Sequence, residues 1–223
     1  MAQLYLVRHG QASFGAADYD KLSELGQQQS LLLGQYFFER NTHFDHIITG
    51  SMLRHKETAD GIQQGLASNL EQEVDAGWNE FDFGAVVKAY ISLHPNEKPK
   101  DDAPRAVFYR LLKVAMYAWS KQELGDGLPE TWQEFRGRVQ QSVDNLCASP
   151  YKKVLVASSG GAIAMAMMNM LNLSVENTVN VNLQIKNTSV SHFFFNKQGM
   201  QLASFNNVGH LDTPEREKLI SYS

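Results

Sequence analysis

An arginine and a histidine stand side by side near the start of the chain, directly after the short apolar run of residues 4–7. They are Arg8 and His9, and Gly10 follows them. Arginine presents a rigid fork of N–H donors that matches phosphate oxygens. A neutral imidazole can attack phosphorus and hold a phosphoryl group covalently. The pair therefore has the chemistry that phosphoryl transfer needs.

Two further segments carry polar side chains at similar points. Residues 50–54 follow a second apolar run and contain Arg54, and residues 158–161 follow a third run and consist of two serines and two glycines. Ser51 is a good N-cap for a helix that we expect to reach about residue 65. A helix N-terminus adds free N–H groups and a partial positive charge. Together with the first pair, these segments suit phosphoryl transfer through a phosphohistidine.

The hydrophobic pattern predicts the elements that position these three segments. Short apolar runs indicate buried strands, and amphipathic stretches between them indicate helices. The resulting order is typical of a three-layer α/β/α domain with a mainly parallel central sheet. Ligands collect at the carboxyl ends of such strands, which is where all three segments fall. The predicted strands are 4–7, 46–49, 70–74, 153–157 and, in a last quarter of strands joined by turns, 179–185, 190–195 and 201–205; the predicted helices are about 22–37, 51–65, 106–121, 131–147 and 160–171.

One stretch interrupts the alternation of strands and helices. Residues 76–130 hold four of the six prolines and a charged patch at 97–102. We expect a helical lid or insertion here, because the stretch is too short to bury a core of its own. After it, Thr131 and Glu134 form the sequence pattern of a capping box. The expected organisation is one domain over residues 1–223 with this lid inserted.

The composition is that of a globular protein, with 43% hydrophobic and 20% charged residues. The formal net charge is −4, so we expect no nucleic-acid partner and no attraction to an anionic membrane. The longest strictly apolar run, residues 162–168, has seven residues, whereas a membrane span needs about 20. No secretory signal is visible, and the single cysteine excludes an internal disulfide. We expect a cytoplasmic protein, and the sequence leaves its oligomeric state open.

Five segments between residue 4 and about residue 165 resemble, in the expected order, motifs of the histidine phosphatase (phosphoglycerate mutase-like) superfamily. Arg8-His9-Gly10 is similar to its Arg-His-Gly signature. The other segments are 22–29 (Leu-Ser-Glu-Leu-Gly-Gln-Gln-Gln), 51–59 (Ser-Met-Leu-Arg-His-Lys-Glu-Thr-Ala), 78–84 (Trp-Asn-Glu-Phe-Asp-Phe-Gly) and 156–161 (Val-Ala-Ser-Ser-Gly-Gly), and His210-Leu211 stands where many members have a late His-Leu pair.

The resemblance implies a role for each matching polar residue. His9 is the implied nucleophile, and Glu80 is the implied proton donor to the leaving alkoxide. Arg8 and Arg54 would bind the phosphoryl oxygens and stabilise charge during transfer. This design requires no metal and no cofactor, and its partner is a small phosphorylated substrate. Further candidate phosphate-binding residues are Ser13, Ser159, Gly160 and His210.

The chain departs from the family pattern at three positions. Ser159 replaces the second catalytic histidine, and a hydroxyl can donate a hydrogen bond to phosphate but cannot carry a positive charge. A charged hydrogen bond of roughly 1.5–3 kcal/mol is thereby reduced to a neutral one. Ala12 lacks a hydroxyl that members often have, although Ser13 next to it could compensate, and Gly15 stands where mutase-like members carry Asn. Residues that could replace the missing charge are His210 and Arg105.

Three functions follow from these residues. The first is a metal-independent phosphatase that hydrolyses a small phosphomonoester through a phosphohistidine at His9. The second is a catalytically weakened phosphate-binding or regulatory module, because of Ser159. The third is a phosphoglycerate mutase, which returns the phosphoryl group to the substrate. Five histidines have no partner in this scheme and are expected at the surface or as satisfied core residues: His43, His46, His55, His94 and His192.

Overall fold

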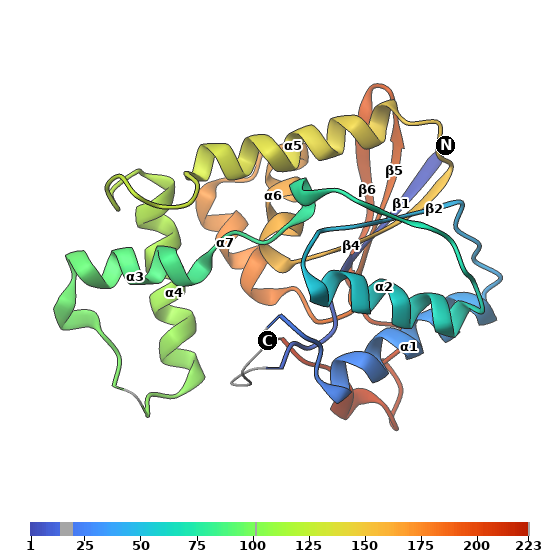
Figure 1. Cartoon of the computed structure of the whole chain (residues 1–223), viewed down its shortest axis with the longest axis horizontal. Helices are drawn as coiled ribbons and strands as arrows, with labels where there is room; N and C mark the ends of the chain where they lie inside the picture. Colours follow the sequence, from blue (N-terminus) through green and yellow to red (C-terminus); the bar gives the residue numbers. More distant parts are fainter. Residues whose placement is uncertain (14–19, 101, 223) are drawn as a thin grey trace.

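The computed structural model describes residues 1–13, 20–100 and 102–222, and Figure 1 shows how its strands and helices are arranged. Within these residues, six strands form one sheet in the order β3-β2-β4-β1-β5-β6. The neighbours β3, β2, β4 and β1 pair in parallel, whereas β5 pairs antiparallel with both β1 and β6. The sheet is therefore mixed but mainly parallel. The strands are β1 (Ala2–Arg8), β2 (His46–Thr49), β3 (Gln72–Val74), β4 (Lys153–Ser158), β5 (Val190–Asn196) and β6 (Gly199–Asn207).

Helices cover both faces of this sheet and complete a three-layer α/β/α fold. Alternate side chains of the strands enter two different cores: Val7 and Leu155 pack with α1 and α2, whereas Leu6 and Val156 pack with α5 and α6. No helix in the described residues is long and apolar enough to cross a membrane. The helices are α1 (Glu24–Glu39), α2 (Leu53–Leu66), α3 (Phe83–Leu93), α4 (Arg105–Ser120), α5 (Trp132–Ala148), α6 (Gly160–Leu171) and α7 (Val175–Gln184), with short 3₁₀ helices at Ala76–Trp78, Pro95–Glu97 and Glu217–Leu219.

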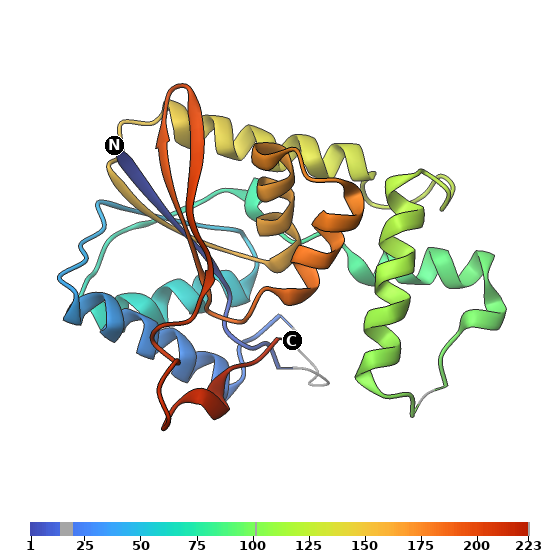
Figure 2. The same ribbon diagram turned by 180° about the vertical axis from the view of Figure 1, so that it is seen from behind.

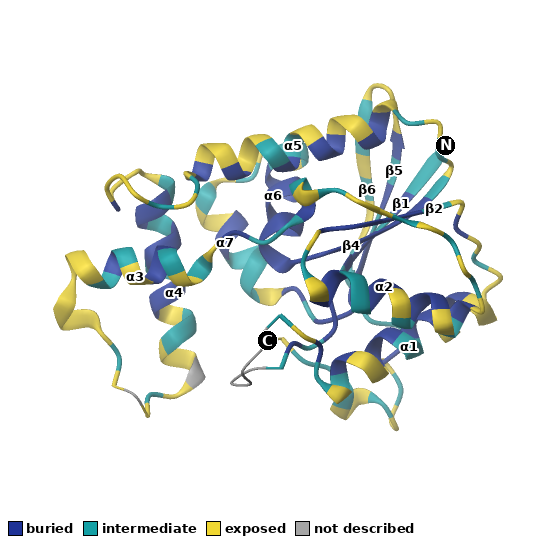
Figure 3. Cartoon of the chain, in the orientation of Figure 1, coloured by how far each residue is buried: buried dark blue, intermediate teal, exposed yellow. Residues whose placement is uncertain are grey.

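The register of the central strands brings the predicted polar segments together. In the β1–β4 pair Arg8 lies opposite Ser158, and in the β2–β4 pair Thr49 lies opposite Ala157. Figure 3 shows that these strands are largely buried, as expected for parallel strands covered on both faces. The residues that follow β1, β2 and β4 therefore emerge beside one another at the carboxyl edge of the sheet.

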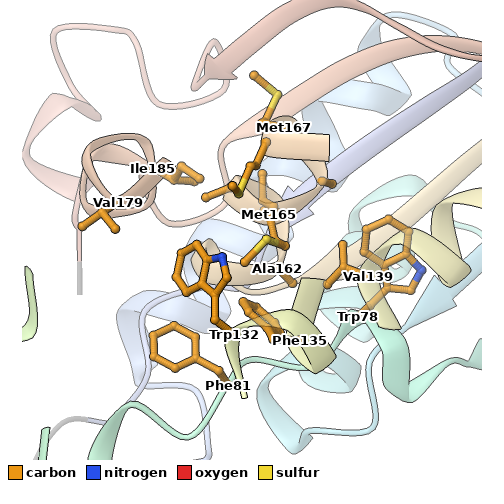
Figure 4. Packing of buried hydrophobic residues seen from close by; sticks show 14 of the residues in the cluster. Trp78, Phe81, Trp132, Phe135, Val139, Ala162, Met165, Met167, Val179 and Ile185 are labelled. Carbon is orange, nitrogen blue, oxygen red and sulfur yellow. The ribbon is translucent and has the colours of Figure 1, made fainter. Parts of the chain in front are cut away.

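The stretch expected as a lid forms the helices α3 and α4, which project to one side of the sheet (Figures 1 and 2). Its buried hydrophobic residues belong to the same cluster as those of α5 and α6. Phe81 stacks on Trp119 with a centroid distance of 4.9 Å, and Trp119 meets Trp132 edge to face at 5.2 Å. Figure 4 shows Phe81 beside Trp132 and Phe135 at this junction. The aromatic contacts attach the segment that contains α3 and α4 to the N-terminal end of α5.

The prediction of a strand at residues 179–185 is wrong, because these residues lie mostly in helix α7. Valine or leucine alternates with asparagine from 179 to 183, which is the period of a strand. Ser174 nevertheless caps a helix, since its side chain accepts a hydrogen bond from the Asn177 backbone N–H. The helix packs against α4 and α6 and buries Thr178 and Val179. Tertiary packing here outweighs the local alternation.

The two predicted N-terminal helix caps, at Thr131 and at Ser51, have different outcomes. The capping box is confirmed: the Thr131 side chain accepts from the Glu134 backbone N–H, and the Glu134 side chain accepts from the Thr131 backbone N–H. Ser51 is not the N-cap of α2, which begins at Leu53. The Leu53 N–H donates instead to Asp20 Oδ2 at 2.8 Å, and Ser51 pairs with Asn79. A carboxylate from another loop thus replaces the local cap.

Candidate active site

His9 lies directly after β1, where its backbone and ring are both held by hydrogen bonds. Its N–H donates to the Ser158 carbonyl at 2.8 Å. Ring nitrogen Nδ1 is 2.7 Å from the Gly10 carbonyl oxygen. A carbonyl can only accept, so the proton is on Nδ1 and the lone pair is on Nε2. The ring is oriented as a nucleophile would need to be.

The electrostatic surroundings of His9 keep its imidazole uncharged. The side chain is buried, and this burial lowers its pKa well below 6.5, with further lowering from the positive charges of Arg54 and Arg8. The imidazole is therefore neutral at neutral pH. A neutral ring retains the lone pair that attack on phosphorus requires.

The two arginines reach the site from different elements. Arg8 ends β1, and its guanidinium donates to the carbonyl of Ile185 and, at 3.4 Å, to that of Tyr222. Arg54 lies in the first turn of α2, where Nη1 pairs with Asp20 Oδ1 at 2.7 Å. Both guanidiniums act on the titration of His9 and also on that of Glu80. The structure thus brings His9, both guanidiniums and the Glu80 carboxyl group into one cluster.

Glu80 is a half-buried residue whose carboxyl group lies at the N-terminus of α6. Oε2 accepts a hydrogen bond from the Gly161 N–H at 3.0 Å, and Oε1 accepts one from the Phe81 N–H at 3.2 Å. Burial raises the pKa of Glu80, and the hydrogen bond from Gly161 and the charges of Arg54 and Arg8 partly oppose this. A raised pKa keeps a proton available for donation. A Cβ at position 161 would collide with Oε1 of Glu80, so only glycine permits this approach.

Ser159 and His55 form a second polar pair beside His9. Ser159 occupies the N-cap position of α6, but its side chain makes no capping hydrogen bond. Its Oγ lies 2.6 Å from Nε2 of His55, which belongs to α2. The centroids of the His55 and His9 rings are 5.8 Å apart. His55, expected at the surface or as a satisfied core residue, is fully buried, and its place directly after Arg54 is the one sequence signal that links it to the site.

The other candidate residues have different surroundings. His210 is buried, and its Nε2 lies 2.9 Å from Oγ1 of Thr188. Gly160 begins α6, where a Cβ would approach the side chains of Asn182 and Arg8. The backbone N–H of Ser13 donates to the Lys21 carbonyl at 2.8 Å. Gly15 and the side chain of Arg105 lie outside the described part of the chain.

Supporting hydrogen bonds connect the segment after β1 to α1 and α2. The Gly10 N–H donates to Oγ1 of Thr58 at 3.0 Å, and this hydroxyl donates to the Arg54 carbonyl. The Gln11 N–H donates to Oε1 of Gln29 at 2.9 Å. These bonds fix the loop that carries His9 against the helix that carries Arg54. Three of the segments that resemble superfamily motifs, those containing Gly10, Gln29 and Thr58, are therefore connected by hydrogen bonds.

A family model described as the histidine phosphatase superfamily (branch 1) matches residues 4–208. The chain therefore belongs to the histidine phosphatase superfamily. It is 25% identical over 237 residues to a Salmonella typhi protein named as a probable phosphoglycerate mutase, GpmB, and the match covers 98% of this chain and 99% of that one.

Solved structures share the fold at lower identity. A phosphoserine phosphatase mutant from Entamoeba histolytica in complex with phosphoserine has a TM-score of 0.60 and 22% identity, covering 95% of this chain and 100% of that one. A mycobacterial glucosyl-3-phosphoglycerate phosphatase in complex with inorganic phosphate has a TM-score of 0.66 and 20% identity, and the match covers 95% of this chain and 100% of that one. A Bacillus anthracis phosphoglycerate mutase has a TM-score of 0.63 and 20% identity over 94% of each chain.

Proposed function

We propose that this protein is a phosphatase that hydrolyses a small phosphomonoester through a phosphohistidine at His9. The observation that carries the proposal is the 2.7 Å contact between Nδ1 of His9 and the Gly10 carbonyl oxygen. Because a carbonyl only accepts, this contact places the proton on Nδ1 and leaves the Nε2 lone pair for phosphorus. The ring is neutral at working pH because burial and two guanidiniums lower its pKa. The protein thus holds an uncharged nucleophile next to groups that attract a phosphate dianion.

The reaction has two balanced steps. In the first, Nε2 of His9 forms a bond to phosphorus, the ester P–O bond breaks, and protonated Glu80 gives its proton to the leaving alkoxide. In the second, the Glu80 carboxylate takes a proton from water, the resulting oxygen attacks phosphorus, and the N–P bond breaks. Inorganic phosphate leaves, and His9 and protonated Glu80 are restored.

The charge that develops on the transferring group is met by Arg8 and Arg54. Phosphoryl transfer depends mainly on positioning and on stabilising the equatorial oxygens. Guanidinium forks aimed at these oxygens supply that stabilisation without a metal ion. Asp20 holds Arg54 by an ion pair of 2.7 Å, so this cation is oriented before the substrate binds. We therefore expect activity in the presence of a metal chelator.

The substrate class follows from the site and from related proteins. Proteins of this fold are described with phosphoserine, with glucosyl-3-phosphoglycerate phosphatase activity and with inorganic phosphate. The helices α3 and α4 project from the domain beside α7. We propose a small phosphorylated metabolite whose non-phosphate part contacts this lid.

The test uses p-nitrophenyl phosphate with EDTA, and rapid alkaline quenching to preserve a phosphohistidine. We expect wild-type turnover and a trapped phosphoenzyme, both of which vanish in His9→Ala. His192→Gln is the matched control, since this histidine lies on β5 and contacts Gln3. Undiminished turnover in His9→Ala would overturn the proposal. Phosphate binding without turnover or phosphoenzyme would instead identify the phosphate-binding module.

A phosphoglycerate mutase is the second candidate, favoured by the name of the Salmonella typhi relative. A mutase returns the phosphoryl group from the histidine to the substrate, whereas a phosphatase gives it to water. Incubation with 3-phosphoglycerate followed by separate measurement of 2-phosphoglycerate and inorganic phosphate distinguishes them. We expect inorganic phosphate to form faster, and the reverse result would establish the mutase.

A further inference from the structure

Two buried polar side chains beside His9 have no part in the mechanism above. Ser159 follows β4 and His55 lies in α2, so they are 104 positions apart in the chain. Both are fully buried, and Oγ and Nε2 are 2.6 Å apart. In the sequence, Ser159 stands where the superfamily has its second catalytic histidine. An imidazole therefore still reaches this position, but from a different helix and through a hydroxyl.

The surroundings of the His55 ring define where its proton lies. Among the described residues, Nδ1 of His55 has no hydrogen-bond partner. It lies against Gly50, where a Cβ would collide with it. A buried N–H without an acceptor costs more than a bare ring lone pair. Burial also lowers the pKa of His55 to about 3, so the ring carries a single proton. That proton is on Nε2, and His55 donates to Ser159.

This direction of donation leaves the Ser159 proton in need of an acceptor. A hydroxyl has one O–H donor and two lone pairs. Oγ uses one lone pair to accept from His55, and among the described residues it makes no other hydrogen bond. The preceding residue, Ser158, accepts the backbone N–H of His9, so Ser159 lies one residue from this contact. A phosphoryl oxygen on His9 is the acceptor that the arrangement lacks.

We propose that His55 and Ser159 together replace the second histidine: His55 Nε2–H donates to Ser159 Oγ, and the serine O–H donates to a phosphoryl oxygen. Ser159 is then a catalytic residue, and His55 is a positioning residue that acts through it. The hydrogen bond from His55 polarises the hydroxyl and strengthens its donation to the phosphoryl group. This inference rests on the proposed phosphatase function.

A different chemistry for the same pair is disfavoured by the same contacts. Ser159 could be a nucleophile and His55 its base, as in serine hydrolases. That role needs the proton on Nδ1 and a third group that holds it there. Nδ1 of His55 instead lies against Gly50 without a partner in the described structure. The geometry therefore favours donation to phosphate over attack by the serine.

A double-mutant cycle tests the relay with p-nitrophenyl phosphate and with orthovanadate binding. We expect Ser159→Ala and His55→Leu each to lower kcat/KM and vanadate affinity about 10- to 100-fold, the range of a hydrogen bond to a charged group. Because the two residues act in series, the double variant should lose no more than either single variant. His55→Gln, which keeps an N–H donor near the Nε2 position, should recover at least half of the logarithmic loss.

A reciprocal variant returns the imidazole to the position it has in the superfamily. His55→Ala combined with Ser159→His removes the ring from α2 and places one after β4. We expect its kcat/KM to exceed that of His55→Ala alone by about 10-fold. Thermal unfolding of each variant, with His192→Gln as the control, ensures that only folded protein is compared. If His55→Leu does not fold, the His55→Gln and reciprocal variants provide the test.

The outcomes separate this inference from the proposed function. Loss of all turnover in His9→Ala, together with additive effects of Ser159→Ala and His55→Leu, would overturn the relay and leave the phosphatase intact. Wild-type turnover in His9→Ala would overturn both. A lowered Tm in His55→Leu with unchanged kcat/KM and vanadate affinity would show that His55 is only a core residue.

Discussion

Two buried histidines of this protein have the same local chemistry and different surroundings. His55 and His210 each have a pKa lowered to about 3, chiefly by burial, and each places Nε2 beside a hydroxyl. Thr188, the partner of His210, donates its own proton to the Asn187 carbonyl at 2.8 Å. Ser159, the partner of His55, has no such carbonyl acceptor among the described residues.

The difference lies in whether the hydroxyl proton has an acceptor within the described part of the protein. In the His210–Thr188 pair the hydroxyl proton has an acceptor within the protein, the Asn187 carbonyl, and we call this pair closed. In the His55–Ser159 pair the hydroxyl proton has no acceptor among the described residues, and we call this pair open. Burial and pKa are alike in both, and only the tracing of donors to acceptors separates them.

The largest effect is expected from a substitution beside the His55–Ser159 pair that displaces Glu80 and leaves the hydroxyl groups of both pairs in place. Gly161→Ala introduces a Cβ that collides with Oε1 of Glu80. We expect the displaced carboxyl group to lower kcat by roughly 10²–10⁴-fold for an alkyl phosphate, the usual contribution of general acid catalysis. A much smaller loss is expected with p-nitrophenyl phosphate, whose leaving group needs little protonation. Equal losses for both substrates would contradict this role of Glu80.

The comparison itself is tested by removing one hydroxyl from each pair. Ser159→Ala should lower kcat/KM by about 10- to 100-fold and should also lower the free energy of unfolding, because the buried Nε2–H of His55 loses its acceptor. Thr188→Ala should lower the free energy of unfolding by roughly 1–3 kcal/mol, because His210 and Asn187 lose a buried partner. Steady-state kinetics and urea unfolding on both variants measure the two effects. The assignment of the two pairs is wrong if Thr188→Ala lowers kcat/KM by this amount and Ser159→Ala leaves kcat/KM unchanged.

A pH effect should be common to the two histidines. Their folded pKa of about 3 lies below the ordinary 6.5, so the unfolded chain binds more protons between these values. Their contribution to stability is complete above pH 6.5 and is lost as the pH falls toward 3. At pH 5 each histidine should lower the free energy of unfolding by roughly 2 kcal/mol relative to its value at pH 7.5. Urea unfolding at both pH values should show a smaller loss in His55→Gln and in His210→Gln than in wild type.

The smallest effect is expected from a substitution outside both histidine pairs, which serves as a control for changes in stability alone. Thr131→Ala removes the capping box of α5, which involves neither histidine pair. We expect about 1 kcal/mol lower free energy of unfolding and unchanged kcat/KM. Thermal unfolding and kinetics on the same preparation measure both. A change in kcat/KM would show that α5 transmits its stability to the site.

Much of the fold could be predicted because its signals are local. The apolar runs at 4–7, 46–49 and 153–157 form central strands, and the predicted strands at 190–195 and 201–205 form the antiparallel pair. Residues 179–185 could not be read in this way, because alternation of valine and asparagine suits a strand as well as one side of a short helix. The contact with α4 and α6 decided between them.

The polar residues of the candidate site were predictable to a similar extent. Arg8, His9, Arg54 and Glu80 were identified from their types and from the resemblance of their segments, and the structure brings them into one cluster. The hydrogen bond between His55 and Ser159 was not predicted, because the two residues are 104 positions apart and neither has a local signature for the pair. The partner of Arg54, Asp20, was missed for the same reason.

By itself the sequence determined the order of the elements, the superfamily, and the chemical types of the groups that follow the central strands. These depend on periodicity, on the conformational preferences of neighbouring residues and on short motifs. Only the tertiary structure decided that α2 packs against β4 so that an imidazole meets the hydroxyl of Ser159. A hydrogen bond between distant segments depends on the positions of both backbones to within an ångström, and no local pattern of residues specifies that.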